Sequence, residues 1–167
     1  IQIQPNYYIA SFEILTIDLK EAEEKERIGI KDKFDQIINQ LPSQFLDYSK
    51  ILIEYFKNTQ EAIFYINKSL NIKEINVNRL IETTSLLLKE DKLQEAYEIF
   101  SQILKKTEKD LTTYLKVCNF YIKIKKFSFS IKILKSFLVD NPYHFNALCE
   151  LSFYYLKDLN FQSALKY

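Results

Sequence analysis

Few residues of this chain could do chemistry, and the sequence separates them widely. It has one histidine, His144, and two cysteines, Cys118 and Cys149. A catalytic base needs an orienting partner and a nucleophile close by, and a zinc site would need carboxylates in addition to these three residues. The sequence has no nucleophile elbow, metalloprotease motif, glycine-rich phosphate loop or Cys-x-x-Cys pair. We therefore predict a protein that is not an enzyme and holds no metal or cofactor.

Each of these residues also has a simpler structural interpretation. We expect His144, which follows Pro142 closely in a turn, to be a solvated side chain. We expect both cysteines to be small buried hydrophobic residues rather than a bridge or a redox pair. The paired carboxylates Glu23 and Glu24 lie in a mixed-charge segment, which is typical of a solvated helix face.

The composition favours helices. In 167 residues, 47% are hydrophobic and 27% charged, which suits a folded protein, but only one is glycine and three are proline. Strands joined by tight turns would need more glycine than this.

The net charge of +1 gives no field that would attract nucleic acid or a membrane surface. No apolar run is long enough to insert into a membrane, and no targeting signal is present, so the compartment stays undetermined. The cysteine usage is compatible with the cytoplasm. Because the chain contains no methionine, we expect a processed product or a fragment.

Internal repetition is the strongest signal in the sequence. The segments KLQEAYEIF (Lys92–Phe100), KFSFSIKIL (Lys126–Leu134) and NFQSALKY (Asn160–Tyr167) share a large apolar residue followed three positions later by a small one. The small residues recur in steps of 34: Ala62, Ala96, Ser130 and Ala164. A period of this length is typical of a solenoid built from helical pairs. Each period holds two stretches of helical apolar spacing, split by a short polar turn such as Lys89–Asp91.

This pattern resembles the tetratricopeptide repeat, in which two antiparallel helices, A and B, fill each period of 34 residues. The resemblance covers residues 43–167 and implies an all-α, right-handed superhelical solenoid of antiparallel helix hairpins. It implies repeats at 43–76, 77–110 and 111–144 and a partial repeat at 145–167, all in one domain. In that family the eighth residue of a repeat is small, so that helix A can approach helix B. Lys50 occupies this position in the first repeat, which is therefore the least regular.

The N-terminal part, residues 1–42, is less regular. Pro5 suits the first turn of a helix. Residues 7–27 then predict one long helix, Gly29 breaks it, and Lys31–Leu41 form a second helix that Pro42 ends. We interpret this part as either a degenerate repeat or a helical hairpin that caps the solenoid.

The resemblance also implies a binding surface. In the family, positions 2, 5, 9, 12 and 13 of each repeat line a concave groove on the helix A side. The residues at these positions are Gln44, Asp47, Ile51, Glu54 and Tyr55; Asn78, Ile81, Ser85, Leu88 and Lys89; Thr112, Leu115, Asn119, Ile122 and Lys123; and Asn146, Cys149, Phe153, Leu156 and Lys157.

Three features of this set each have two interpretations. The residues at position 2 could hydrogen-bond a peptide backbone, or they could cap the helix N-termini. The apolar residues could receive a partner helix, or they could pack neighbouring helices A together. The three lysines at position 13 could hold an acidic partner, or they could offset the helix dipole. The lysine and asparagine pair with which related domains clamp acidic chaperone tails is missing here.

We therefore expect a non-catalytic scaffold that binds a partner peptide or helix in its concave groove. The alternative is a structural module for self-association or assembly into a larger complex. The last helix begins within Asn160–Tyr167, and no glycine, asparagine or proline follows that would end it. Residues 111–139 contain six lysines and no acid, but these positions fall on several faces, so we expect no binding of nucleic acid.

Overall fold

The computed structural model describes residues 5–73, 76–107 and 110–167, and these ranges contain helices and turns but no strand. None of their helices is long and apolar enough to cross a membrane. The chain divides into two compact units, unit 1 (residues 1–91) and unit 2 (residues 92–167). Each unit has its own helical packing.

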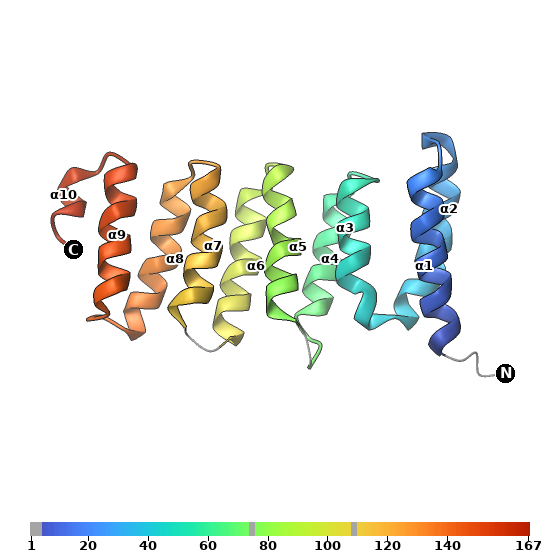
Figure 1. Cartoon of the computed structure of the whole chain (residues 1–167), viewed down its shortest axis with the longest axis horizontal. Coiled ribbons are helices and arrows are strands. Elements are labelled where there is room, and N and C mark those ends of the chain that lie inside the picture. Colours follow the sequence, from blue (N-terminus) through green and yellow to red (C-terminus); the bar gives the residue numbers. More distant parts are fainter. Residues whose placement is uncertain (1–4, 74–75, 108–109) are drawn as a thin grey trace. The chain divides into compact units, whose positions relative to one another are not determined.

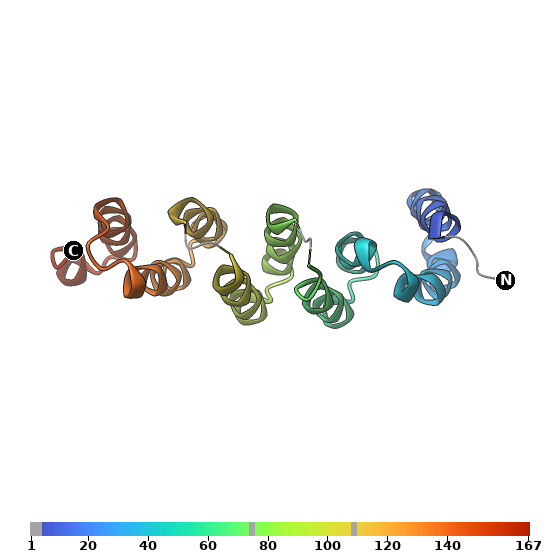
Figure 2. The same cartoon turned by 90° about the horizontal axis from the view of Figure 1, so that it is seen from below.

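Unit 1 is built from successive antiparallel helices (Figure 1). Its elements are α1 (Pro5–Glu21), α2 (Glu24–Ile37), the short 3-10 helices η1 (Ile38–Gln40) and η2 (Pro42–Gln44), α3 (Phe45–Glu54), α4 (Thr59–Ser69) and α5 (Val77–Lys89). Helix α1 packs on α2, α3 packs on α4, and α5 contacts both α3 and α4. Figure 2 shows α1, α3 and α5 in one layer of this unit, with α2 and α4 in the other.

Unit 2 repeats the same arrangement. Its helices are α6 (Leu93–Lys106), α7 (Leu111–Lys123), α8 (Phe127–Asp140), α9 (Phe145–Lys157) and α10 (Phe161–Ala164). Helix α8 packs between α7 and α9, and α10 packs on α9. Within this unit α7 and α9 lie in one layer, and α6, α8 and α10 lie in the other (Figure 2). The all-α fold of antiparallel helix hairpins is therefore confirmed.

The N-terminal helices differ from the prediction at one point. Helix α1 begins at Pro5, as expected, but the chain breaks after Glu21 and not at Gly29, which lies inside α2. Glu23 starts α2 with a capping box, in which its side chain bonds the backbone of Glu26 and the Glu26 carboxylate accepts from the Glu23 amide at 3.2 Å. A single glycine costs a helix only about 1 kcal/mol, so a well-capped helix tolerates it.

The turns that join helix A to helix B share one backbone conformation. Lys57, Asp91, Lys125 and Leu159 have φ values of 53°, 56°, 58° and 59°, and they follow one another at intervals of 34 residues. This left-handed conformation costs a residue with a side chain about 1 kcal/mol or more. In unit 2 this residue ends helix A with a Schellman motif, in which the Lys126 and Asn160 amides donate to the Tyr121 and Tyr155 carbonyl oxygens, both at 2.9 Å.

Small residues bring the two helices of each hairpin in unit 2 into close contact. The Ser130 hydroxyl of α8 donates to the Cys118 carbonyl oxygen of α7 at 3.0 Å, and the Cys118 thiol donates back to the Ser130 carbonyl oxygen at 3.5 Å. In the next hairpin the Ser152 hydroxyl donates to the Ala164 carbonyl oxygen at 2.8 Å. Side chains of α7 and α9 thus reach the backbone of the helix that follows, because the residue at the crossing is small.

The first hairpin makes the same contact one residue out of register. In α3 it is Ser49, and not Lys50, whose hydroxyl lies 3.3 Å from the Ala62 carbonyl oxygen of α4. Ser49 is fully buried, whereas Lys50 is exposed. These partners are 13 residues apart, against 12 in the hairpins of unit 2. The turn after α3 therefore has one extra residue, and the expectation that Lys50 occupies the helix crossing is wrong.

A partly buried polar cluster ties α2, α3 and α4 together. The Tyr48 hydroxyl of α3 donates to the Asp35 carboxylate of α2, and Lys31 bridges Asp35 at 2.8 Å and Glu61 of α4 at 3.0 Å. Burial and the Asp35 carboxylate raise the pKa of Tyr48 far above that of a free phenol, so its hydroxyl stays protonated and remains a donor. The cluster fixes the irregular N-terminal pair on the first hairpin.

A substitution at the helix crossing tests how much the fold depends on this close approach. Ser130 is fully buried between α7 and α8, so a leucine there would push the helices apart and remove the hydrogen bond to Cys118. We expect Ser130→Leu to lower the free energy of unfolding by about 3 kcal/mol, as measured by urea denaturation. Ser128→Leu, at an exposed position of the same helix, should change it by less than about 0.5 kcal/mol. Equal effects of the two substitutions would contradict this account.

Candidate partner-binding site

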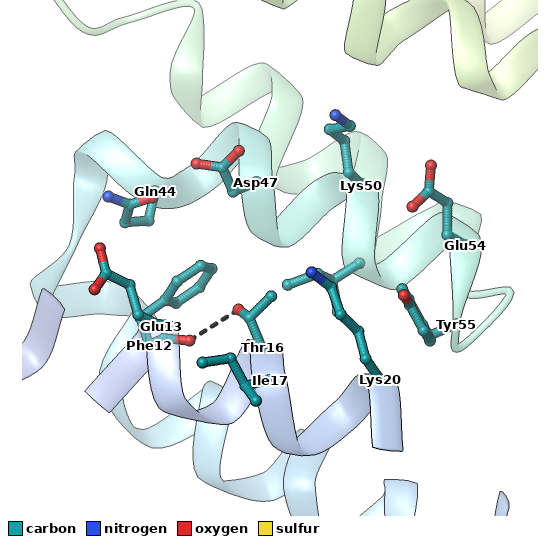
Figure 3. A pocket seen from close by; sticks show the side chains of 11 residues that line it. Phe12, Glu13, Thr16, Ile17, Lys20, Gln44, Asp47, Lys50, Glu54 and Tyr55 are labelled. Atoms are coloured by element: carbon teal, nitrogen blue, oxygen red, sulfur yellow. Dashed lines mark hydrogen bonds between the residues drawn. The ribbon is translucent and has the colours of Figure 1, made fainter. Parts of the chain in front are cut away.

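A groove lies between α1 and α3 of unit 1. Its volume is about 560 Å³. Helix α1 lines one side and α3 with its C-terminal end the other (Figure 3). The lining residues are Phe12, Glu13, Thr16, Ile17 and Lys20 from α1, and Gln44, Asp47, Lys50, Ile51, Glu54 and Tyr55 from the α3 side.

The floor of this groove is apolar and firmly packed. Phe12 and Ile51 are buried, and the Phe12 ring meets the Phe34 ring of α2 edge to face with centroids 5.1 Å apart. The Thr16 hydroxyl donates to the Phe12 carbonyl oxygen at 2.8 Å, so it is satisfied within α1 (Figure 3). Ile17, in contrast, is 56% exposed. An apolar side chain of a partner would gain contact with Ile17 without displacing the core.

The rim of the groove carries charges of both signs. Asp47 forms an ion pair with Arg79 of α5, which fixes its carboxylate on one side of the opening. Glu13 of α1 and Glu54 of α3 lie toward opposite ends of the groove, and Lys20 and Lys50 complete the rim (Figure 3). In the part of the chain that the structure describes, none of these last four residues forms a salt bridge within 4.0 Å. Mixed charges of this kind give specificity for a partner's charge pattern more than affinity.

The residues predicted for the first repeat come together in this groove. Gln44, Asp47 and Ile51 all line it, together with Glu54 and Tyr55. The prediction missed the α1 side of the groove. The helical spacing of Phe12, Leu15 and Leu19, which are all buried, was the available signal.

The α5 residues of the predicted set do not form an open surface. Asn78 and Lys89 are exposed, and the half-buried Ser85 donates its hydroxyl to the Glu82 carbonyl oxygen at 2.6 Å. Ile81 is 0% exposed and Leu88 only 8%. Helix α5 packs directly against α3 and α4, and most of its apolar side chains are buried. Ile81 therefore cannot contact a partner, and here the packing interpretation of the apolar residues applies.

The α7 and α9 residues of the set remain accessible. In α7, Thr112, Asn119 and Lys123 are exposed, and Leu115 and Ile122 are half-buried. In α9 all five residues are exposed: Asn146, Cys149, Phe153, Leu156 and Lys157. Phe153 and Leu156 are each 46% exposed. Unit 2 thus presents apolar and polar side chains together along α7 and α9.

The helix caps are not the residues at position 2. Asn76, Asp110 and His144, each two residues earlier, accept hydrogen bonds from the backbone amides of Arg79, Thr113 and Ala147 at 3.1, 3.2 and 3.4 Å. The hydrogen bonds from Thr113 lower the pKa of Asp110. His144 is half-buried and its ring lies edge to face on Phe137 at 5.4 Å, so the expectation of a solvated side chain is wrong. Gln44 precedes α3 but makes no cap hydrogen bond.

Comparison with solved structures finds helical repeat proteins. A structure titled "Crystal structure of MamA protein" matches with a TM-score of 0.52 and 13% identity, covering 95% of this chain and 86% of that chain. "MamA 41-end from Desulfovibrio magneticus RS-1" matches with a TM-score of 0.48 and 13% identity, covering 95% and 89%. MamA is a helical repeat protein of tetratricopeptide type, so the first likeness shows that this chain shares an all-α helical repeat fold. No protein-family model matches the chain, and no curated protein matches it by sequence.

The two cysteines differ in a way that a thiol reagent can measure. Cys118 is buried against α8, and desolvation raises the pKa of its thiol to about 12. Cys149 is exposed on α9, which corrects the expectation that both are buried. We expect Ellman's reagent at pH 8 to modify one thiol per folded chain and two in denaturant, because the reagent needs an accessible thiolate. Cys149→Ser should abolish the reaction of the folded chain, whereas a fast reaction remaining in that variant would contradict the burial of Cys118.

Proposed function

We propose that this chain is a non-catalytic protein-interaction scaffold of tetratricopeptide type. Its repeats would be residues 43–76, 77–110, 111–144 and 145–167, and residues 1–42 would be a degenerate repeat that closes the first hairpin. The likeness to MamA in fold and the recurrence of left-handed turn residues every 34 positions support this proposal. Helical repeats of this kind use their surfaces to bind other proteins rather than to carry out reactions.

The observation that carries the proposal is the groove between α1 and α3. It combines an apolar floor, one exposed apolar residue and a charged rim in a space large enough for several side chains of a peptide. Peptide recognition by helical surfaces depends on apolar anchors that enter such grooves, with polar groups around them that fix the register. A partner peptide or helix would place apolar side chains on Phe12, Ile17 and Ile51 and meet the charged residues at the rim.

Selection from a random peptide library displayed on phage tests this function and requires no identified partner. We expect peptides selected on the intact chain to lose about tenfold or more in affinity for Ile17→Glu, because the substitution puts a charge where an apolar anchor binds. The substitution should not affect folding, since Ile17 is 56% exposed.

Ile28→Glu is the matched control for that experiment. Ile28 is also an exposed isoleucine, but it lies on α2 outside the groove. Its affinities should stay within about twofold of the unaltered chain. Peptides whose binding is unchanged by Ile17→Glu, or reduced equally by both substitutions, would exclude the groove as the binding site.

Self-association is a second candidate function, and the exposed apolar residues at the end of unit 2 favour it. Phe161 and Leu165 in and after α10 are 59% and 90% exposed, and Leu159 in the preceding turn is 74% exposed. A second copy of the chain would cover these side chains. We expect the weight-average sedimentation coefficient to rise with protein concentration and Leu165→Glu to suppress the rise. A coefficient that stays that of a monomer at all concentrations would exclude this candidate.

A further inference from the structure

The second unit carries an accessible surface that is separate from the α1–α3 groove. We name it the α7–α9 face and define it by the accessible residues that α7 and α9 place at equivalent positions: Thr112, Leu115, Asn119, Ile122, Lys123, Asn146, Cys149, Phe153, Leu156 and Lys157. Both helices lie on the same side of α8 (Figure 2). Their registers match, because Cys118 and Ser152, at equivalent positions, contact α8 and α10 at the same sequence separation.

The face combines apolar residues with exposed side chains that can form hydrogen bonds. Phe153 and Leu156 are neighbours on α9 and are each 46% exposed, and Leu115 and Ile122 of α7 are half-buried. Asn119 and Asn146 are exposed beside them. Amide side chains can donate to and accept from a peptide backbone whatever its sequence. The face therefore suits a protein segment that offers apolar side chains.

Lysines supply the charge of the face. Lys123 and Lys157 are the last residues of α7 and α9, and both are exposed. Their ammonium groups lie 5.9 Å from the Phe120 ring centroid and 5.1 Å from the Phe153 ring centroid, respectively. Each ammonium group thus lies near an aromatic ring of its own helix while its side chain stays exposed. In the described residues, neither lysine forms a salt bridge within 4.0 Å.

The carboxylates near this face do not neutralise it. Helix α7 has no acidic residue, and Asp110 before it is engaged as the helix cap. Helix α9 has one, Glu150, which is half-buried and acts on the neighbouring Tyr154 hydroxyl, whose pKa burial and this carboxylate raise. Asp158, which follows Lys157, is exposed. Unit 2 as a whole has twelve lysines and seven acidic residues, whereas residues 1–91 have eleven basic and fifteen acidic residues.

We propose that the α7–α9 face binds an acidic amphipathic segment of a partner protein. Apolar side chains of the segment pack on Phe153, Leu156 and Leu115, and carboxylates that flank them pair with Lys123 and Lys157 at one edge. Opposite charges across an interface fix its register and accelerate encounter. Nucleic acid fits less well, because the face includes apolar residues and the lysines of α8, such as Lys132 and Lys135, belong to the other layer of the unit. The proposal rests on the scaffold function but does not require the α1–α3 groove.

A pair of synthetic peptides tests the partner's chemistry directly. Both carry leucines at helical spacing among alanine and glutamine, and they differ only in having glutamates or lysines beside the leucines. We expect fluorescence anisotropy to show the glutamate peptide binding the intact chain at least about tenfold more tightly than the lysine peptide, with affinity falling as salt rises. Equal binding of the two peptides would overturn the proposal.

Two pairs of charge reversals locate the binding. Lys123→Glu with Lys157→Glu should weaken binding of the glutamate peptide about tenfold, because both reversals lie on the face. The control, Lys105→Glu with Lys132→Glu, changes the net charge equally at exposed positions of α6 and α8 and should weaken it by less than about threefold. Leu156→Ser should also weaken binding, by about fivefold, since it removes an apolar contact. Equal losses for the two pairs would mean that net charge alone attracts the peptide, and the proposal would then fail.

Cys149 provides a readout of where the peptide lies. Because it is exposed in the middle of the face, a bound glutamate peptide should slow its modification by a maleimide in proportion to occupancy. A peptide that leaves Cys149 reactive but loses binding on Ile17→Glu occupies the α1–α3 groove; the scaffold function then stands and the present proposal fails. A single-stranded DNA oligonucleotide that binds the face and protects Cys149 in place of the peptide would also overturn it.

Discussion

The rest of the structure depends on the close approach of the two helices in each hairpin. Where Ser130 meets Cys118 and Ser152 meets Ala164, side chains hydrogen-bond the backbone of the opposing helix, and no large residue separates them. The turn that follows contains a residue in the left-handed conformation, even where this residue is lysine. The close approach also decides which side of each helix is buried and which is left for binding.

Differences in packing explain why equivalent positions behave differently. In α9, the residues on the outer side stay exposed, and Phe153 and Leu156 are available to a partner. In α5, contacts with α3 and α4 cover Ile81 and Leu88, so the same positions become part of the core. The α1–α3 groove exists because the N-terminal pair is held on the first hairpin by the Tyr48–Asp35 cluster. In each unit, the accessible surface thus consists of the side chains that helix packing does not bury.

The sequence predicted the features that depend on local pattern. Small residues every 34 positions and one glycine in the whole chain indicated helix hairpins, and these are present. What it could not predict depends on loop length and tertiary contact. The extra turn residue, which places Ser49 and not Lys50 at the helix crossing, cannot be recognised from the apolar pattern. The burial of Ile81 depends on the helices that pack against α5. Residue type alone indicates a helix break at Gly29, whereas the strength of the Glu23 cap decides where α2 begins.

The one-residue shift in the first hairpin bears on how such proteins diversify. Because an α-helix turns by about 100° per residue, one residue added to a turn presents a different stripe of an unchanged helix to its surroundings. Here α3, whose following turn has one extra residue, places Gln44, Asp47 and Ile51 in the α1–α3 groove. A tandem duplication can therefore acquire a new ligand specificity through an insertion or deletion in a turn, before any surface residue is substituted. In this architecture, the length of a turn helps to determine which side chains are available for binding.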